Sequence, residues 1–179
     1  MSVPLCETIQ SVADGFGVIQ QDLLRQVADG WQAARTGDGF PARQDIHPEA
    51  FPAALAYIYL MDRELPPHHW RYRLAGNEVA RALGLEKAKG LSLKDIMPPH
   101  GLPTVIERWG PVTDPGAAVY MCGTIYYNSE RYAQGGRLLL PLSQSRSREV
   151  TGLLGISVSE VRPQRSGDEL TLHTCTISL

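Results

Sequence analysis

The chain lacks any concentration of charge of one sign. Its 17 Lys and Arg residues nearly balance its 19 Asp and Glu residues, which leaves a formal net charge of −2. No block of like charges occurs anywhere along the 179 residues. Surfaces that bind nucleic acid normally carry a clustered basic excess. The charge distribution therefore predicts that nucleic acid is not a partner.

Long hydrophobic runs are also missing. A helix that crosses a membrane needs roughly 18 or more consecutive apolar residues, and no stretch of this chain approaches that length. The opening sequence MSVPLCETIQSVADG has neither the basic start nor the continuous apolar segment of a signal peptide. We therefore expect no membrane span and a cytoplasmic location.

Cysteine is scarce and widely spaced. Cys6, Cys122 and Cys175 form neither the close pairs of a zinc site nor a disulfide framework. The five histidines form no H-x-x-x-H pair and no H-E-x-x-H motif, which are the usual spacings of zinc ligands. These patterns predict reduced thiols and no metal site.

Catalytic motifs are absent too. The nearest approach is GISVS at 155–159, but Ser replaces the second Gly of the G-x-S-x-G nucleophile elbow, and the segment has the pattern of a continuous strand. Gly135-Gly136 lacks the Lys-Ser/Thr of a phosphate-binding loop and instead predicts a turn between two strands. We therefore expect that this protein is not an enzyme.

What the chain does contain is a clear succession of predicted elements. Helical periodicity indicates a helix over 18–34 and shorter helices near 78–83, 92–97 and 102–112. Strand-like runs occupy 57–61, 70–74, 117–127, 137–142, 150–161 and 170–179. Because the strands are grouped and do not alternate one-for-one with helices, the order favours an α+β fold with an antiparallel sheet.

The first helix carries a narrow apolar stripe of Leu24, Val27 and Trp31. One interpretation is that this stripe packs on the domain's own sheet. The other is a self-association seam, because so narrow a stripe is typical of helices that pair with each other. We predict that residues 1–36 form an N-terminal helical extension of a domain over 37–179, and that Leu24, Val27 and Trp31 form the contact of a homodimer.

Several short sequence motifs resemble those of the PAS domain. The stretch WRYRLAGNEVARALGLEKAKGLSLKDIMPP is similar to the PAS core. It contains the motifs RYRLAG (Arg71–Gly76) and GLSLKDI. Two further motifs are similar to those of a bacterial family of stand-alone PAS proteins with an N-terminal helix, namely Trp31–Arg35 and Pro41–Asp45. The resemblance covers roughly residues 18 to 160. Asn77 departs from the Thr expected there, but Asn caps helices at least as well.

This resemblance implies a PAS fold: a five-stranded antiparallel sheet with short helices over one face, preceded by the N-terminal helix. It also implies a sensory or docking module and no reaction. Two functions remain open. The domain either binds a small organic ligand and passes its state to a protein partner, or serves without a ligand as a protein–protein interaction module for dimerisation or docking.

The resemblance also bears on cofactors. PAS domains that hold haem use a histidine from the region that contains His100, so haem is disfavoured here but stays open. Flavin sensing through a covalent adduct needs a reactive cysteine beside the helix that covers the flavin. No cysteine lies between Cys6 and Cys122, which excludes that subtype. The cofactor, if there is one, is not identified.

Aromatic residues with polar tips are the best indication of a ligand site. The chain has seven Tyr and three Trp against three Phe, and such rings suit a cavity that is mostly apolar with a few hydrogen-bonding groups. A packed core whose Tyr hydroxyls reach solvent is the equally open alternative. The predicted pocket residues are Tyr59, Tyr72, Leu74, Trp109, Met121 and Leu140.

Overall fold

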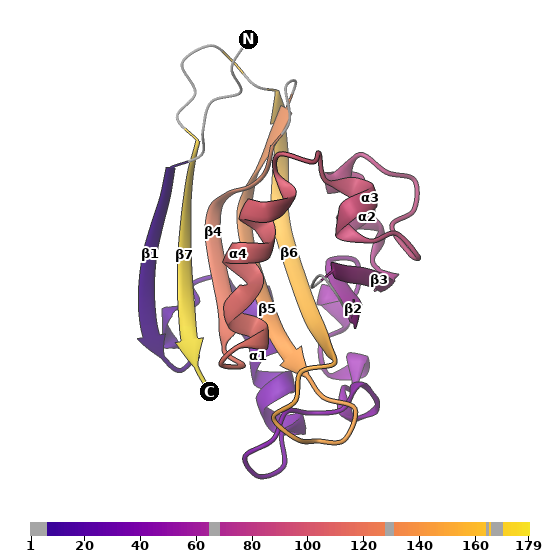
Figure 1. The fold of residues 1–179 in the computed structure, drawn as a ribbon, viewed down its shortest axis with the longest axis vertical. Coiled ribbons are helices and arrows are strands. Elements are labelled where there is room, and N and C mark those ends of the chain that lie inside the picture. Colours follow the sequence, from indigo (N-terminus) through magenta and orange to yellow (C-terminus); the bar gives the residue numbers. More distant parts are fainter. Residues whose placement is uncertain (1–6, 65–68, 128–130, 164, 166–169) are drawn as a thin grey trace.

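The computed structural model describes residues 7–64, 69–127, 131–163, 165 and 170–179. Within these residues the chain forms a single seven-stranded sheet in the order β1-β7-β4-β5-β6-β2-β3 (Figure 1). The strands are β1 (Glu7–Asp14), β2 (Ile58–Glu64), β3 (His69–Ala75), β4 (Ala118–Tyr127), β5 (Arg131–Leu142), β6 (Gly152–Pro163) and β7 (Thr171–Ser178). The α-helices are α1 (Asp22–Ala34), α2 (Asn77–Leu83), α3 (Leu93–Ile96) and α4 (Leu102–Thr113). Four short 3-10 helices complete the fold: η1 (Phe16–Val18), η2 (Arg43–Asp45), η3 (Pro48–Ala50) and η4 (Pro52–Ala54).

The sheet is larger than predicted and is mixed. Five consecutive strands, β4-β5-β6-β2-β3, pair antiparallel, but β7 adds to the edge of β4 and β1 pairs parallel to β7. The prediction of a five-stranded antiparallel sheet is therefore corrected. The sequence ETIQSVAD of β1 gave no strand signal, because this edge strand buries little and depends on pairing with a segment more than 150 residues away.

Helices cover both faces of the sheet. In Figure 1, α4 crosses in front of β4 and β5 with α2 and α3 beside it, while α1 lies behind β5 and β6. Because successive side chains of a strand point to opposite faces, covering both faces buries a continuous apolar run. Leu138, Leu139 and Leu140 are accordingly all fully buried. In the sequence, the alternation of Leu138, Leu140 and Leu142 predicts one buried face for this strand, whereas the structure buries both faces.

The apolar stripe of α1 is part of this core. Leu24, Val27 and Trp31 are 0% exposed within a single chain, and the indole of Trp31 lies edge-on to Phe16, with ring centroids 6.1 Å apart. The prediction that these three side chains form a dimer contact is wrong, because the chain's own sheet already covers them. The predicted boundary between residues 36 and 37 likewise does not separate α1 from the rest of the core.

Gly135 and Gly136 lie inside β5, where a turn was predicted. They pair with Gly123 and Cys122 of β4 and with Ser159 and Val158 of β6. A Cβ at Gly136 would collide with the side chain of Gln21 beside α1, and one at Gly135 would collide with the carbonyl of Val158. These glycines permit close approach of neighbouring groups, which is the other common use of glycine in a strand.

No helix among the described residues is long and apolar enough to cross a membrane. The described part of the chain also contains no group of three His, Cys, Asp or Glu residues placed to hold a metal ion. Cys122 is half-buried and Cys175 is buried, and both are free thiols. Cys6 lies outside the described residues.

Candidate functional site: a cavity with a buried arginine

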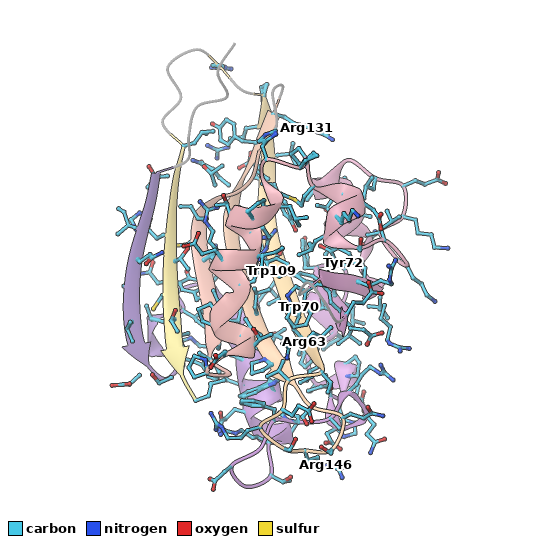
Figure 2. The ribbon with its side chains drawn as sticks, in the orientation of Figure 1. Arg63, Trp70, Tyr72, Trp109, Arg131 and Arg146 are labelled. Atoms are coloured by element: carbon cyan, nitrogen blue, oxygen red, sulfur yellow. The ribbon has the colours of Figure 1, made fainter. Side chains whose placement is uncertain are left out.

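A cavity of about 400 Å³ lies between the sheet and the helices α2, α3 and α4. Figure 2 labels Tyr72 on β3 and Trp109 on α4 beside this space, with Arg131 toward its upper end. Most of its wall is apolar or aromatic. The lining includes Leu83, Leu93, Ile96, Met97, Val105, Met121, Ile125, Tyr126, Ala133 and Leu172.

Three of the six predicted pocket residues line this cavity, namely Tyr72, Trp109 and Met121. Tyr59 is fully buried with its ring 5.5 Å from that of Tyr72, so it supports the wall without lining it. Leu140 is fully buried but points to the opposite face of the sheet from Arg137, a lining residue three positions earlier in β5.

Leu74 is 44% exposed and is not a lining residue. Its prediction assumed unbroken alternation with Tyr72 along β3. The register of β2 and β3 shifts, however, so that Leu60 pairs with Leu74 while its neighbour Met61 pairs with Tyr72. Because Leu60 and Met61 point to opposite faces, so do their partners. An irregularity of one residue therefore moves Leu74 out of the site.

The charged centre of the site is Arg137 on β5, which the sequence analysis did not identify. Its residue exposure is only 6%. Its Nε donates a hydrogen bond of 3.0 Å to Oγ of Ser157, and its guanidinium carbon lies 4.3 Å from the ring centroid of Tyr126 and 5.5 Å from that of Trp109. Among the described residues, no carboxylate forms an ion pair with it.

The guanidinium keeps its charge in this setting. Burial acts to lower the pKa of Arg137, but its net shift is upward, and an arginine side chain stays protonated at ordinary pH. Burial also raises the pKa of Tyr59 and Tyr72, so both phenols stay neutral at ordinary pH. The site therefore holds one fixed positive charge among neutral rings. A buried charge without a counter-ion is costly and normally has a partner.

Further basic side chains also line the cavity. Arg108, Arg131 and His100 contribute to its wall, and no Asp or Glu does so among the residues that the structure describes. No acidic lining residue among them therefore offsets the charge of Arg137. The side chain of His100 is exposed, which does not favour a buried haem ligand at this position.

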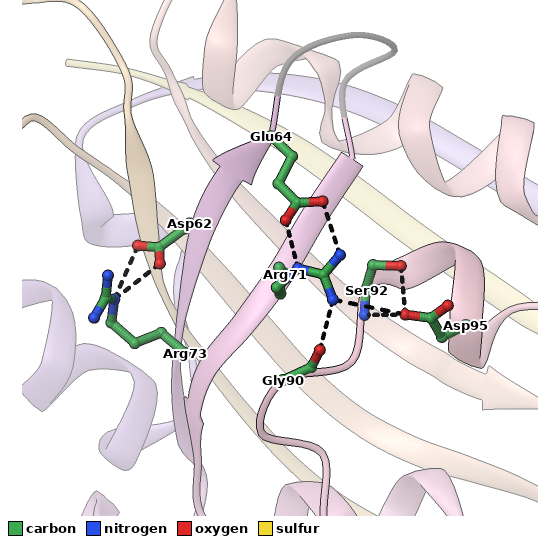
Figure 3. Close-up of polar contacts among 7 residues, drawn as sticks. All are labelled: Asp62, Glu64, Arg71, Arg73, Gly90, Ser92 and Asp95. Atoms are coloured by element: carbon green, nitrogen blue, oxygen red, sulfur yellow. Dashed lines mark hydrogen bonds and ion pairs between the residues drawn. The ribbon is translucent and has the colours of Figure 1, made fainter.

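One side of the cavity is held in place by Arg71 on β3. Figure 3 shows its guanidinium paired with the carboxylate of Glu64 on β2, where Nη2 and Oε2 are 3.1 Å apart. Its Nη1 also donates a hydrogen bond of 2.6 Å to the carbonyl oxygen of Gly90. A second ion pair, Arg73 with Asp62, joins the same two strands at 2.8 Å. These contacts hold the loop before α3 against the sheet edge.

The start of α3 is fixed by a local cap. Asp95 accepts hydrogen bonds from the backbone N–H of Ser92 at 2.7 Å and from its hydroxyl at 2.8 Å (Figure 3). These bonds lower the pKa of Asp95, with a smaller contribution from Arg71. Leu93 and Ile96 of this helix line the cavity, so the cap positions part of its wall.

A signal for Arg137 was present in the sequence. It shares a face of β5 with Leu139 and Pro141, in a strand that otherwise runs LLLPL after Gly136. An arginine in register with buried positions of a strand is unusual, because Arg is almost never fully buried without a partner. The strand predicted from the sequence begins at residue 137, and its pattern of alternating leucines assigns no role to Arg137.

Comparison with known proteins agrees with this architecture. No curated protein matches the sequence. The PAS domain family, by contrast, matches residues 19–158, from just before α1 into β6. That span covers α1, the strands β2 to β5, the first part of β6 and the helices around the cavity. The chain therefore belongs to the PAS domain family.

Proposed function

We propose that this domain is a sensory module that binds a small organic molecule in the cavity beneath α4 and passes the bound state to a cytoplasmic protein partner. PAS domains are generally sensory and not catalytic. The observation that carries the proposal is the cavity itself: about 400 Å³, walled largely by apolar and aromatic side chains, with one buried arginine. Ligand sites in proteins have this size and composition.

Ligand binding would act on the helical wall. A ligand in the cavity contacts α3 and α4 on one side and β4 and β5 on the other. It therefore stabilises the conformation in which the helices close on the sheet, and it shifts the population toward that conformation. A protein partner that contacts this wall would distinguish the occupied domain from the empty one. The motifs Trp31–Arg35 and Pro41–Asp45, which resemble motifs of stand-alone bacterial PAS proteins, would fit an output of this kind.

Native mass spectrometry of the intact protein tests the proposal. We expect a co-purifying mass, or a compound from a chemically diverse library that raises the melting temperature. Ala82→Phe should abolish that binding, because Ala82 lines the cavity and a phenyl ring would fill part of it. Gln32→Phe is the matched control, because Gln32 lies on the exposed side of α1. Failure of every compound to bind the parent would refute the proposal.

A second candidate is the unliganded interaction module, and the edge strand β1 favours it. Among the described strands, β1 pairs only with β7, and Ile9 and Val12 on it are 48% and 77% exposed. An exposed sheet edge with apolar side chains is a template for pairing with another chain, including a second copy. Under this alternative, Val12→Lys lowers the mass of the assembly in light scattering, and no ligand is found.

A further inference from the structure

We infer that the ligand of the cavity is a small organic anion, an apolar body bearing a carboxylate, and that Arg137 binds its carboxylate. This inference rests on the proposed function, since it names the class of molecule that the cavity takes. It starts from an imbalance of charge. The cavity wall includes the arginines Arg137, Arg108 and Arg131 but no acidic side chain among the described residues.

The imbalance is sharpest at Arg137. Protein interiors compensate buried charges with ion pairs, because an uncompensated charge in a region of low dielectric constant is strongly unfavourable. Arg137 is 6% exposed, and its Nε donates a hydrogen bond to the neutral hydroxyl of Ser157. A guanidinium has five N–H donors, so donors remain for an acceptor inside the cavity. A carboxylate from a ligand would supply the missing counter-ion.

The guanidinium of Arg137 is also preorganised for such a ligand. The rings of Tyr126 and Trp109 lie 4.3 Å and 5.5 Å from it, and Ser157 fixes its Nε. Cation–π contacts of this kind offset part of the cost of burying the charge and limit the orientations of the group. A planar guanidinium held in one orientation pairs with a carboxylate through two parallel hydrogen bonds. Because the group is already fixed, little conformational entropy is lost when the ligand binds.

The remainder of the wall defines the rest of the ligand. Leu83, Ile96, Val105, Met121 and Ile125 present only aliphatic surface, which favours an apolar body of hydrocarbon or aromatic character. The cavity of about 400 Å³ excludes large ligands and accommodates a molecule of a few dozen atoms at most. The predicted class is therefore a medium-chain or aryl-substituted carboxylic acid.

Isothermal titration calorimetry on the full chain tests the inference with matched probes. The two sets are octanoate, octanamide and octylamine, and 4-phenylbutyrate, 4-phenylbutyramide and 4-phenylbutylamine. Within a set only the head group changes. We expect a carboxylate to bind the parent at least about tenfold more tightly than its amide, as a charge-assisted hydrogen bond provides, and the amine to bind least.

Arg137→Gln should remove this preference, so that carboxylate and amide bind with similar affinity. The control Arg73→Gln removes an exposed arginine from the neighbouring part of the sheet and should leave the preference intact, because Arg73 pairs with Asp62 outside the cavity. Arg137→Met supplies a readout that a purely structural arginine would not give. Without ligand its melting temperature should equal or exceed that of the parent, because it removes an uncompensated charge.

The outcomes separate the inference from the proposed function. The inference is overturned if the amide or the amine of a set binds the parent protein as tightly as the carboxylate of that set. It is also overturned if no carboxylate binds while a neutral or cationic compound does. In both cases the sensory function stands. If nothing binds the parent at all, both fail. If Arg137→Gln does not fold, Arg137→Met takes its place in the test of Arg137, and the comparison of head groups on the parent still decides the class of ligand. A loss of melting temperature in ligand-free Arg137→Met would also count against the inference.

Discussion

The indole Nε1 of Trp31 donates a hydrogen bond of 2.9 Å to the carbonyl oxygen of Pro141, which lies 110 residues further along the chain. This bond joins α1 to the end of β5 on the face of the sheet that α4 does not cover. Leu24 and Val27 of the same helix are buried beside it. The first helix is thus a structural layer of the domain, although its narrow apolar stripe is typical of a helix that pairs with a second copy.

A shortened chain that begins at Asp38 should therefore fail to fold. It loses the whole α1 layer, and removal of a single buried Trp side chain typically costs about 3–5 kcal/mol. Domains of this size have only about 5–15 kcal/mol of stability in total. Circular dichroism should show no cooperative thermal transition. A shortened chain that unfolds cooperatively near the melting temperature of the full chain would show that α1 is dispensable.

Leu140→Ala should lower the free energy of unfolding by about 2–5 kcal/mol, through lost burial and the cavity that is left. Leu140 lies on β5, is 0% exposed, and faces the side of the sheet that α1 covers. Leu74→Ala is the control, because that leucine is 44% exposed and should cost less than about 1 kcal/mol. Urea unfolding measures both. Equal losses at the two sites would contradict the burial described for them.

Leu140 and Leu74 also show how far sequence patterns can lead. Alternation of apolar residues predicted both strands, because a period of two reflects local geometry. The side of the sheet that each residue faces depends on more. Leu74 is displaced by a shift in the pairing of β2 with β3, and β5 is buried on both faces because a helix far away in sequence covers the second face. Neither effect can be predicted from the few residues that surround Leu74 or Leu140 in the sequence.

The site was partly predictable for the same reason. Tyr72 and Trp109 could be placed from strand alternation and helical spacing, and both line the cavity. The role of Arg137 was not predicted, because its burial arises where β4, β5, β6 and α4 converge to bring Ser157, Tyr126 and Trp109 around it. Charged residues in a pattern are assigned to the surface unless a partner is visible, and the partners here are neutral rings.

Gly155→Ala should destabilise the protein by about 1–3 kcal/mol through overpacking. A Cβ at Gly155 would collide with the ring of Tyr59, which is fully buried and lies 5.5 Å from the ring of Tyr72. Gly110→Ala is the matched control: nothing lies within 4 Å of a Cβ there, and the site is inside α4.

The control should therefore stabilise the protein by about 0.5–1 kcal/mol, because alanine favours the helix. Opposite signs for the two substitutions in urea unfolding are the expected result. Stabilisation by Gly155→Ala would mean that Tyr59 can move away from β6.

The ion pair of Asp45 with Arg146 should make stability depend on pH in the acid range. Arg146 donates hydrogen bonds of 2.6 Å and 2.8 Å to the two carboxylate oxygens of Asp45, and the backbone N–H of Ala42 donates a third at 2.9 Å. The bonds from Arg146, followed by that from Ala42, lower the pKa of Asp45 from 3.8 to about 2. A carboxylate whose pKa is lower in the folded state stabilises that state above its unfolded pKa, and the stabilisation is lost as the pH falls toward the folded pKa.

Asp45→Asn removes this titration, so the parent should exceed the variant in stability by a constant amount above about pH 5, where Asp45 is ionised in both states. The difference should then shrink as the pH falls from about 4 toward 2, because folded Asp45 becomes protonated across that interval. Urea unfolding of both proteins between pH 7 and pH 3 measures it. Arg146→Gln provides an independent check by NMR titration, since removing the guanidinium should move the pKa of Asp45 up toward 3.8. A difference that stays constant down to pH 3, or an Asp45 pKa already near 3.8 in the parent, would show that the pair does not hold the carboxylate ionised.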